Sequence, residues 1–335
     1  MTADGPRLEA VLEGMRVVAI PLRVRFRGID VREVALVEGP AGWGEFGPFL
    51  EYEPPEAARW LAAAVESAYA GWPEPVRDVV PVNATVPAVP AGDVAGVLGR
   101  FPGCTTAKVK VAEAGQSLAD DLDRVAAVRS RLGTDARIRV DANGAWSVEE
   151  ATEALTRLAA YGLEYAEQPC ASVTELREVR LALARAGVEV PVAADESIRK
   201  ASDPARVARE EAADVVVVKA APLGGVRRAL EVVAECGLPA VVSSALDTSV
   251  GIAAGVALAA ALPSLDHACG LATVGLFEGD VATPSLVPAT GLLRAGRVTP
   301  DPGLLDRWAA PTDRVRWWRD RVRRCWDLLG REDDG

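Results

Sequence analysis

Short runs of β-branched and other apolar residues recur along the chain from about residue 79 onward. Their centres lie roughly 24 to 31 residues apart, and Ala-, Leu-, Glu- and Arg-rich stretches of helical length separate them. The eight predicted strands are Val79–Val89, Thr105–Ala112, Arg137–Asn143, Leu163–Pro169, Val190–Ser197, Val215–Pro222, Pro239–Leu246 and His267–Val274. This alternation predicts an α/β protein with a parallel sheet, and eight strands with covering helices close most naturally into a barrel.

The stretches between the runs carry signals for helix ends. Ser147–Glu150 and Ser172–Glu175 are capping boxes that predict helix starts. An open, doubly wound sheet is the alternative to the barrel, but no G-x-G-x-x-G motif follows the first run, which disfavours that alternative. We interpret Gly224–Gly225 after the sixth run as a tight turn into the next helix rather than as a phosphate cradle.

The chain before the first run has a different pattern. Two strands with alternating apolar and polar residues are predicted over Met15–Arg25 and Asp30–Glu38. A Gly- and Pro-rich loop over residues 42–48 and an Ala-rich helix over Pro55–Ala70 follow them. These elements predict a small α+β unit beside the barrel.

The length of 335 residues is sufficient for a large buried core and two domains. We expect residues 1–78 to form the N-terminal part of the α+β unit and residues 79–283 to form the barrel. Residues 284–335 are expected to pack back on the α+β unit.

The composition excludes several classes of function. A formal net charge of −11 and a pI near 4.9 argue against nucleic acid or an anionic membrane surface as a partner, so a small molecule is expected. His267 is the only histidine, which excludes multi-histidine zinc sites and disfavours a Ser-His-Asp triad. No apolar run is long enough to span a bilayer, and the five cysteines form no C-x-x-C pair. We therefore expect a cytoplasmic protein; the sequence does not predict its oligomeric state.

Charged residues stand at the ends of five successive predicted strands. In chain order they are Lys108 and Lys110, Asp141, Glu167, Asp195, and Lys219. Catalytic residues of a βα barrel lie at these strand ends, and the period of two directs both lysines of the first pair to the same side. Three convergent carboxylates without histidine or thiolate are hard oxygen ligands, which predicts a site for Mg²⁺, with Mn²⁺ as the alternative.

Only four of the 37 basic residues are lysines, so the lysines at the strand ends need an explanation. An arginine cannot act as a base because it does not lose its proton, whereas a lysine can once its pKa falls by about 3 units, or about 4 kcal/mol. A divalent ion about 5.5 Å away, at an effective dielectric constant of about 20, supplies on the order of 6 kcal/mol of repulsion. Each motif alone is typical of a solvated surface or a turn, but together they predict a metal-assisted base.

This order of strand-end residues resembles that of the enolase superfamily, in particular its muconate-lactonizing-enzyme subgroup, over nearly the whole chain. The resemblance implies a (β/α)7β barrel, a modified TIM barrel, with an α+β capping domain. It also implies a set of roles: metal ligands at Asp141, Glu167 and Asp195, the acid/base at Lys110, a contact to the substrate carboxylate at Lys108, and a cation on the opposite face at Lys219.

Within this subgroup the resemblance implies a metal-dependent lyase that removes water from a succinyl-bearing cyclohexadiene carboxylate, a step towards menaquinone. Ser243 and Ser244 lie in a segment similar to the one that receives the succinyl group. Arg139 precedes Asp141 by two residues, so we expect it to face the barrel mouth and attract the second acid group. The ordinary alternatives are that the serines satisfy backbone groups and that Arg139 pairs with a barrel carboxylate.

Two alternative functions stay open at this point. A racemase of N-succinylamino acids would use Lys110 and Lys219 as acid and base on opposite faces of the substrate. A non-catalytic barrel that binds a metal or a partner protein is the second alternative. We expect His267, at the start of its strand, to have a structural role.

Overall fold

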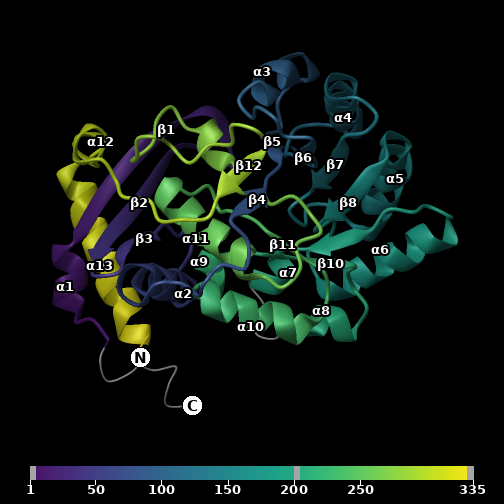
Figure 1. The fold of residues 1–335 in the computed structure, drawn as a ribbon. Coiled ribbons are helices and arrows are strands. Elements are labelled where there is room, and N and C mark those ends of the chain that lie inside the picture. The colour runs from purple at the N-terminus through teal and green to yellow at the C-terminus, as the bar shows by residue number, and fades with distance from the viewer. Residues whose placement is uncertain (1–4, 200–203, 330–335) are drawn as a thin grey trace.

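The computed structural model describes residues 5–199 and 204–329. Near the N-terminus, three strands form an antiparallel sheet in the order β1 (Met15–Phe26), β2 (Ile29–Gly39) and β3 (Gly42–Phe46), after the short helix α1 (Leu8–Glu13). Helix α2 (Pro54–Val65) packs on this sheet and continues into a π-helical turn over Glu66–Ala70. Figure 1 shows this unit, called the cap below, beside the parallel sheet of the barrel.

The Gly- and Pro-rich loop predicted over residues 42–48 is wrong in part, because Gly42–Phe46 form β3. Strand β3 lies so close to α2 that a Cβ atom on Gly44 would stand 2.1 Å from the carbonyl oxygen of Ala64. The glycine therefore permits a close approach of helix and sheet, which the local sequence pattern does not distinguish from a loop.

The second unit is built on a seven-stranded parallel sheet in the order β11-β10-β9-β8-β7-β6-β5. Its strands are β5 (Ala84–Val86), β6 (Thr106–Lys110), β7 (Arg137–Asp141), β8 (Leu163–Glu167), β9 (Val192–Ala194), β10 (Val215–Val218) and β11 (Ala240–Val242). Each connection carries helix, as expected for βα units. The connecting helices are α3 (Val94–Leu98), α4 (Leu118–Leu132), α5 (Val148–Leu158), α6 (Val173–Arg185), α7 (Glu196–Arg199), α8 (Arg206–Arg209), α9 (Ala220–Leu223) and α10 (Val226–Cys236).

Backbone contacts of Cys269 and Gly270 link the two edges of this sheet. Gly270 forms a parallel bridge with Ser243, just after β11, and Cys269 forms one with Val82, just before β5. The predicted eighth strand over His267–Val274 therefore closes the barrel through single bridges. It follows helix α11 (Ser249–Ala261).

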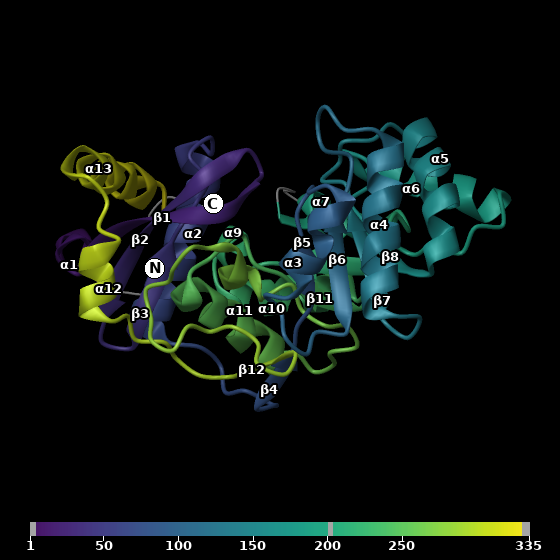
Figure 2. The same cartoon turned by 90° about the horizontal axis from the view of Figure 1, so that it is seen from above.

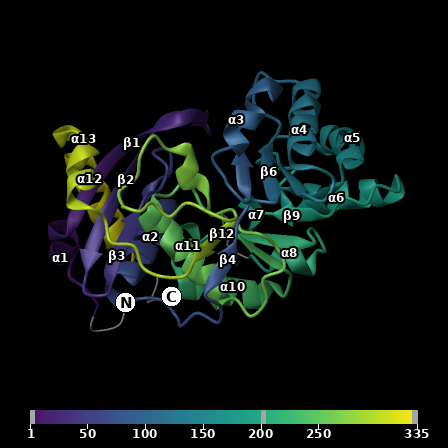
Figure 3. The same cartoon turned by 45° about the horizontal axis from the view of Figure 1, so that its top comes forward.

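The first predicted barrel strand, Val79–Val89, is divided in two. Its first part is β4 (Val79–Pro81), which pairs antiparallel with β12 (Leu292–Arg294), and only β5 joins the barrel. Figure 3 shows β4 and β12 beside each other at the edge of the barrel.

The C-terminal segment also reaches the cap. Helix α12 (Pro302–Arg307) precedes α13 (Thr312–Leu329), which packs on α1, α2 and β1. Figure 2 shows α12 and α13 beside the β1–β2 ribbon, although these elements come from opposite ends of the chain. Trp318 donates a hydrogen bond to Glu33 (2.9 Å), and Arg321 donates to the carbonyl oxygens of Phe49 (2.8 Å) and Tyr52 (2.6 Å).

Two groups of buried apolar side chains form the core. The larger group runs continuously through the cap and the layer between the barrel strands and their helices. The smaller group lies inside the barrel and consists of Tyr165, Ala193, Val215, Val217 and Val241. Among the described helices, none combines the length and the apolar character needed to cross a membrane.

Candidate active site

Lys110, Asp141 and Glu167 stand side by side at the ends of three adjacent strands. In the parallel register, Lys110 of β6 is the partner of Asp141 of β7, and Asp141 is the partner of Glu167 of β8. Lys108 lies two residues earlier on β6, so its side chain points to the same side of the sheet. Strand register therefore turns four separate sequence positions into one cluster.

The two lysines of β6 neutralise the neighbouring carboxylates. Lys110 Nζ lies 2.5 Å from Asp141 Oδ2. Lys108 Nζ lies 3.3 Å from the same oxygen and 2.9 Å from Glu167 Oε1. The carboxylate side chains are 1% exposed and that of Lys110 is 12% exposed, so these charges interact with little screening by water.

Asp195 and Lys219 complete the cluster from the next two strand ends. Asp195 follows β9, Lys219 follows β10, and their side chains form a buried ion pair. Gln168, directly after Glu167, accepts hydrogen bonds from the backbone N–H groups of Asp195 (2.9 Å) and Ser197 (3.2 Å). Its own backbone has a φ of 38°, in the left-handed region, so the strand ends in a strained turn that holds the Asp195 backbone.

The environment shifts the pKa values of the two β6 lysines in opposite directions. Burial lowers the pKa of Lys110, and the charge of Lys108 lowers it further, although Asp141 acts against both. For Lys108, burial also acts to lower the pKa, but the charges of Glu167 and Asp141 outweigh burial and raise it. Lys110 is thus the easier of the two to deprotonate.

The carboxylates differ from one another as well. Burial alone would raise the pKa of Asp141, but the ammonium groups of Lys110 and Lys108 hold it well below its usual range. Burial and the charge of Asp141 raise the pKa of Glu167 to about 7. Adjacent anions in a water-poor site require a cation to remain charged together.

The carboxylate oxygens of this cluster are the type of donor atom that a hard divalent cation prefers. Glu167 Oε2 and Asp195 Oδ1 are buried and accept no hydrogen bond from the described residues, so each retains a lone pair for a cation. Within residues 5–199 and 204–329, no three acidic, histidine or cysteine side chains are already gathered as a metal cage. The lysine ammonium groups instead neutralise the carboxylates.

A small cavity lies over this cluster, between the barrel strand ends and the cap. The cap contributes Phe26, Arg27 and Phe49 to its lining. The barrel contributes Thr85, Lys108, Lys110, Asp141, Asn143, Lys219, Ser243, Ser244, Ala245, Leu246, Gly270 and Thr273. Lys110 and Lys219 thus reach the same cavity from different strands.

Ser243 and Ser244 both line this cavity, at the end of β11. The hydroxyl of Ser244 donates to the carbonyl oxygen of Gly270 (2.8 Å) and also lies 2.8 Å from the Thr273 hydroxyl. Ser244 therefore already satisfies the backbone of the segment that closes the barrel.

Arg139 does not reach the cavity, contrary to the sequence-based expectation. Its side chain is fully buried one layer deeper in the barrel, where Nε lies 2.5 Å from Glu164 Oε2 and Nη1 lies 2.6 Å from the Ala268 carbonyl oxygen. Glu164 also contacts His267 Nδ1 at 2.9 Å. The pairing register shifts between Ile138 and Arg139, at the point where β8 supplies Glu164. A guanidinium group bound in this way is unable to contact a substrate at the strand ends.

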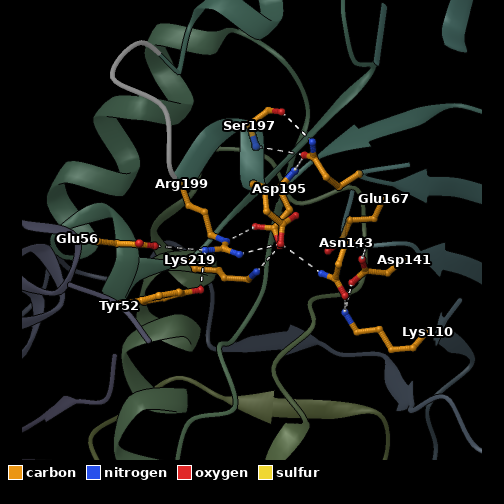
Figure 4. A network of polar contacts seen from close by, with 12 residues as sticks. Tyr52, Glu56, Lys110, Asp141, Asn143, Glu167, Asp195, Ser197, Arg199 and Lys219 are labelled. Carbon is orange, nitrogen blue, oxygen red and sulfur yellow. Dashed lines mark hydrogen bonds and ion pairs between the residues drawn. The ribbon is translucent and has the colours of Figure 1, made fainter. Parts of the chain in front are cut away.

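Three polar residues at the site had no role assigned from the sequence: Asn143, Gln168 and Arg199. Asn143 Oδ1 accepts a hydrogen bond from Lys110 Nζ (2.6 Å), and the backbone N–H of Asn143 donates to Asp141 Oδ1 (3.0 Å). Arg199 lies against Asp195, as Figure 4 shows. They follow the strand-end carboxylates Asp141, Glu167 and Asp195 by two, one and four residues, and this proximity is the signal that the sequence offered.

The fold and the site agree with comparisons against protein families. Residues 99–305 match the model "Enolase C-terminal domain-like", and residues 17–68 match "Enolase N-terminal domain-like". The chain belongs to the enolase superfamily. This result confirms the resemblance stated from the strand-end residues and the expected (β/α)7β barrel with an α+β cap.

The chain is similar over nearly its whole length to curated o-succinylbenzoate synthases. It is 59% identical to that of Mycobacterium tuberculosis (strain ATCC 25618 / H37Rv) over 325 residues, which cover 97% of each chain. It is 60% identical to that of Mycolicibacterium smegmatis over 330 residues, which cover 98% of this chain and 100% of the other.

Solved structures with lower identity share the fold. Muconate lactonizing enzyme from Pseudomonas fluorescens, in complex with muconolactone, matches with a TM-score of 0.75 at 21% identity, and the match covers 88% of this chain and 98% of that one. N-succinyl Arg/Lys racemase from Bacillus cereus matches with a TM-score of 0.71 at 19% identity, covering 89% and 97%. These structures support the architecture alone.

Proposed function

We propose that the chain is a Mg²⁺-dependent o-succinylbenzoate synthase, a carbon–oxygen lyase of menaquinone biosynthesis. It converts 2-succinyl-6-hydroxy-2,4-cyclohexadiene-1-carboxylate into o-succinylbenzoate and water. Similarity to the curated synthases over 97% of the chain supports this reaction. The structural observation that carries it is the pair Lys108 and Lys110 at one strand end, where Lys110 Nζ lies 2.5 Å and Lys108 Nζ 3.3 Å from the same oxygen of Asp141.

Asp141, Glu167 and Asp195 are the residues that would hold the metal ion. Their oxygen atoms suit Mg²⁺, with Mn²⁺ as a substitute, and two buried oxygens of this set accept no hydrogen bond from the described residues. When bound, the ion supplies positive charge beside the substrate carboxylate and so stabilises negative charge that develops there.

Lys110 acts as the base and Lys108 as the carboxylate contact. Lys108 stays charged because its pKa is raised, so it suits a substrate carboxylate. Lys110 removes the proton from the ring carbon that bears this carboxylate, which breaks the C–H bond and gives an enediolate. It then returns that proton to the hydroxyl group leaving from the neighbouring carbon on the same face. The C–O bond breaks, the ring becomes aromatic and water leaves.

Lys219 contributes a fixed positive charge on the other side of the cavity. Its ion pair with Asp195 keeps the ammonium group in place. The cap closes the cavity over the reacting atoms with Phe26 and Phe49, which exclude water from the enediolate. The succinyl group is then directed towards Ser243 and Ser244 at the end of β11.

A turnover assay tests this function. The purified full-length protein is mixed with Mg²⁺ and the cyclohexadiene carboxylate, and the aromatic product is followed by ultraviolet absorbance. We expect turnover that disappears in Lys110→Ala. Absence of turnover by the unaltered protein, or full turnover by Lys110→Ala, would overturn the proposal.

A racemase of N-succinylamino acids is the second candidate, because Lys110 and Lys219 reach the same cavity from different strands. Two lysines on opposite faces of one α-carbon suit removal of a proton on one face and its return on the other. Exchange of the α-proton of N-succinyl amino acids in D₂O detects this activity. Dehydration without such exchange excludes it.

A further inference from the structure

Arg199 is a buried cation at the place where the cap meets the barrel. It ends the short helix α7, one turn after Asp195, and only 4% of the residue is exposed. We propose that Arg199 is a positioning residue that holds Asp195 in its metal-binding orientation and links the cap to Lys110. This inference rests on the function proposed above. Three sets of contacts carry it, and Figure 4 shows them together.

The first contact fixes the Asp195 carboxylate from two sides. Lys219 pairs with Oδ2, and Nε of Arg199 lies 3.4 Å from Oδ1. Oδ1 is buried yet accepts no hydrogen bond from the described residues. Arg199 therefore restricts the rotation of the carboxylate while leaving this oxygen available to an incoming cation.

The second contact leads to the base. Nη2 of Arg199 donates to Glu196 Oε1 (2.7 Å), and the same oxygen accepts from Asn143 Nδ2 (3.3 Å). Asn143 Oδ1 in turn accepts from Lys110 Nζ (2.6 Å). Because Asn143 donates to Glu196 with its amide nitrogen, its amide oxygen is turned towards Lys110. Through Glu196, the orientation of Arg199 thus determines that Lys110 Nζ contacts the amide oxygen of Asn143 beside Asp141.

The third contact joins this network to the cap. Nη1 of Arg199 donates to the hydroxyl group of Tyr52 (3.2 Å), just before α2, and lies 3.9 Å from Glu56 Oε1 on α2. The ring of Tyr52 packs edge to face on Phe49, with centroids 5.6 Å apart, and Phe49 lines the substrate cavity. The same guanidinium group therefore contacts both Asp195 and the part of the cap that lies beside the cavity.

The planar guanidinium group is required for this arrangement, because its nitrogen atoms reach Asp195, Glu196 and Tyr52 in fixed directions. A lysine in the same place retains the charge but offers one compact ammonium group. The substitution Arg199→Lys therefore separates positioning from charge. If Arg199 acted only through its charge, the lysine variant would behave like the unaltered protein.

Binding of Mn²⁺ to the metal-free, full-length protein, followed by the electron paramagnetic resonance of free Mn²⁺, tests this inference without substrate. We expect Arg199→Lys to bind Mn²⁺ about 10-fold more weakly and to lower kcat by a similar factor, as for other residues that orient metal ligands. The loss should fall mainly on kcat rather than on KM, because Arg199 itself is absent from the cavity lining and touches the cavity only through its neighbours. Affinity equal to that of the unaltered protein would overturn the inference.

Arg199→Met gives an independent result, since it removes the charge as well. Loss of a cation next to a metal ligand favours tighter Mn²⁺ binding if charge alone matters, whereas loss of positioning weakens it. We expect weaker binding, and tighter binding would overturn the inference. Melting temperature and circular dichroism show which of the two Arg199 variants folds. The Mn²⁺ affinity of a folded variant then decides the question.

Arg129→Lys is the matched control. Arg129 on α4 donates to the carbonyl oxygens of Tyr161 (2.6 Å) and Ala136 (2.7 Å), and it lines neither the cavity nor the carboxylate cluster. Its Mn²⁺ affinity should equal that of the unaltered protein even if its stability falls. Mn²⁺ binding requires no turnover, so it tests the inference independently of the proposed function. If the proposed function is wrong, the unaltered protein forms no o-succinylbenzoate.

Discussion

Glu66 of the cap closes the N-terminus of a barrel helix that begins at Val226. Its carboxylate accepts hydrogen bonds from the backbone N–H groups of Val226 (2.5 Å) and Arg227 (3.2 Å) at the start of α10. A Cβ atom on Gly225 would lie 2.3 Å from Glu66 Oε2, and Gly225 has a φ of 132°. The glycine pair before α10 thus admits a carboxylate from the cap to the N-terminus of the helix, where backbone N–H groups need an acceptor.

Removal of this carboxylate should weaken the junction of cap and barrel. Glu66→Ala leaves two backbone donors without their acceptor and removes a negative charge from a helix N-terminus, so the free energy of unfolding should fall by about 1 to 2 kcal/mol. Urea denaturation measures this change. The exposed Glu178→Ala on α6 is the control, with an expected change below about 0.5 kcal/mol. Equal stability of the two variants would contradict the capping role.

Replacement of the base by arginine should abolish turnover without unfolding the site. Lys110→Arg retains a cation beside Asp141, but arginine does not release a proton near neutral pH. We expect kcat to fall by about 10² to 10⁴, the usual contribution of a general base, with a much smaller change in melting temperature. Single-turnover kinetics and thermal denaturation give the two readings. An active arginine variant would show that another group takes the proton.

The rate should depend on pH through Lys110. The base acts in its neutral form, so kcat/KM should rise as the pH rises through the pKa of Lys110. Burial and the neighbouring Lys108 lower that pKa, so the midpoint of the rise should lie below pH 10.5, the ordinary value for lysine. A pH–rate profile measured with Mg²⁺ in excess checks this. A midpoint at or above pH 10.5 would mean that the pKa is not lowered.

The pair of Arg139 and Glu164 should govern stability in acid rather than substrate binding. Burial acts to raise the pKa of Glu164, but the hydrogen bond to His267 and the charge of Arg139 lower it to about 2 from an ordinary value of 4.5. Its contribution to stability is therefore complete above about pH 4.5 and is lost as the pH falls towards 2.

Glu164→Gln should remove this acid dependence. It should also lower the free energy of unfolding by about 3 kcal/mol or more near neutral pH, because it leaves Arg139 buried without a counter-charge. Acid titration of urea unfolding measures both effects. The KM should not change; a large rise would place this pair at the substrate after all.

The sequence predicted the strand-end cluster because its positions follow from local rules. The period of two within Thr106–Lys110 and the order of βα units place Lys108, Lys110, Asp141 and Glu167 at one end of a barrel without knowledge of distant contacts. The same rule places the Arg139 side chain on the inner face of the barrel, but it does not predict how far below the strand ends that side chain lies. A shift in the pairing register of β7 and β8 brings Glu164 to the same depth as Arg139.

Local sequence patterns do not predict the contacts between the cap and the barrel. Arg199 contacts Tyr52, which is distant in the sequence, so only the folded chain shows what the guanidinium group does. The close packing of Gly44 on α2 likewise made a strand resemble a loop. Long-range packing, rather than any single propensity, determined both features.

The protonation of Lys110, measured with and without metal, tests the central claim most directly. The chain has only four lysines, so ¹³C labelling of the lysine Cε atoms gives few signals, and Lys110→Arg identifies the relevant one. A divalent cation held by Asp141, Glu167 and Asp195 should repel the ammonium charge. We expect Mg²⁺ to move the titration midpoint of Lys110 to lower pH by at least about one unit. The same midpoint with and without Mg²⁺ would contradict the account.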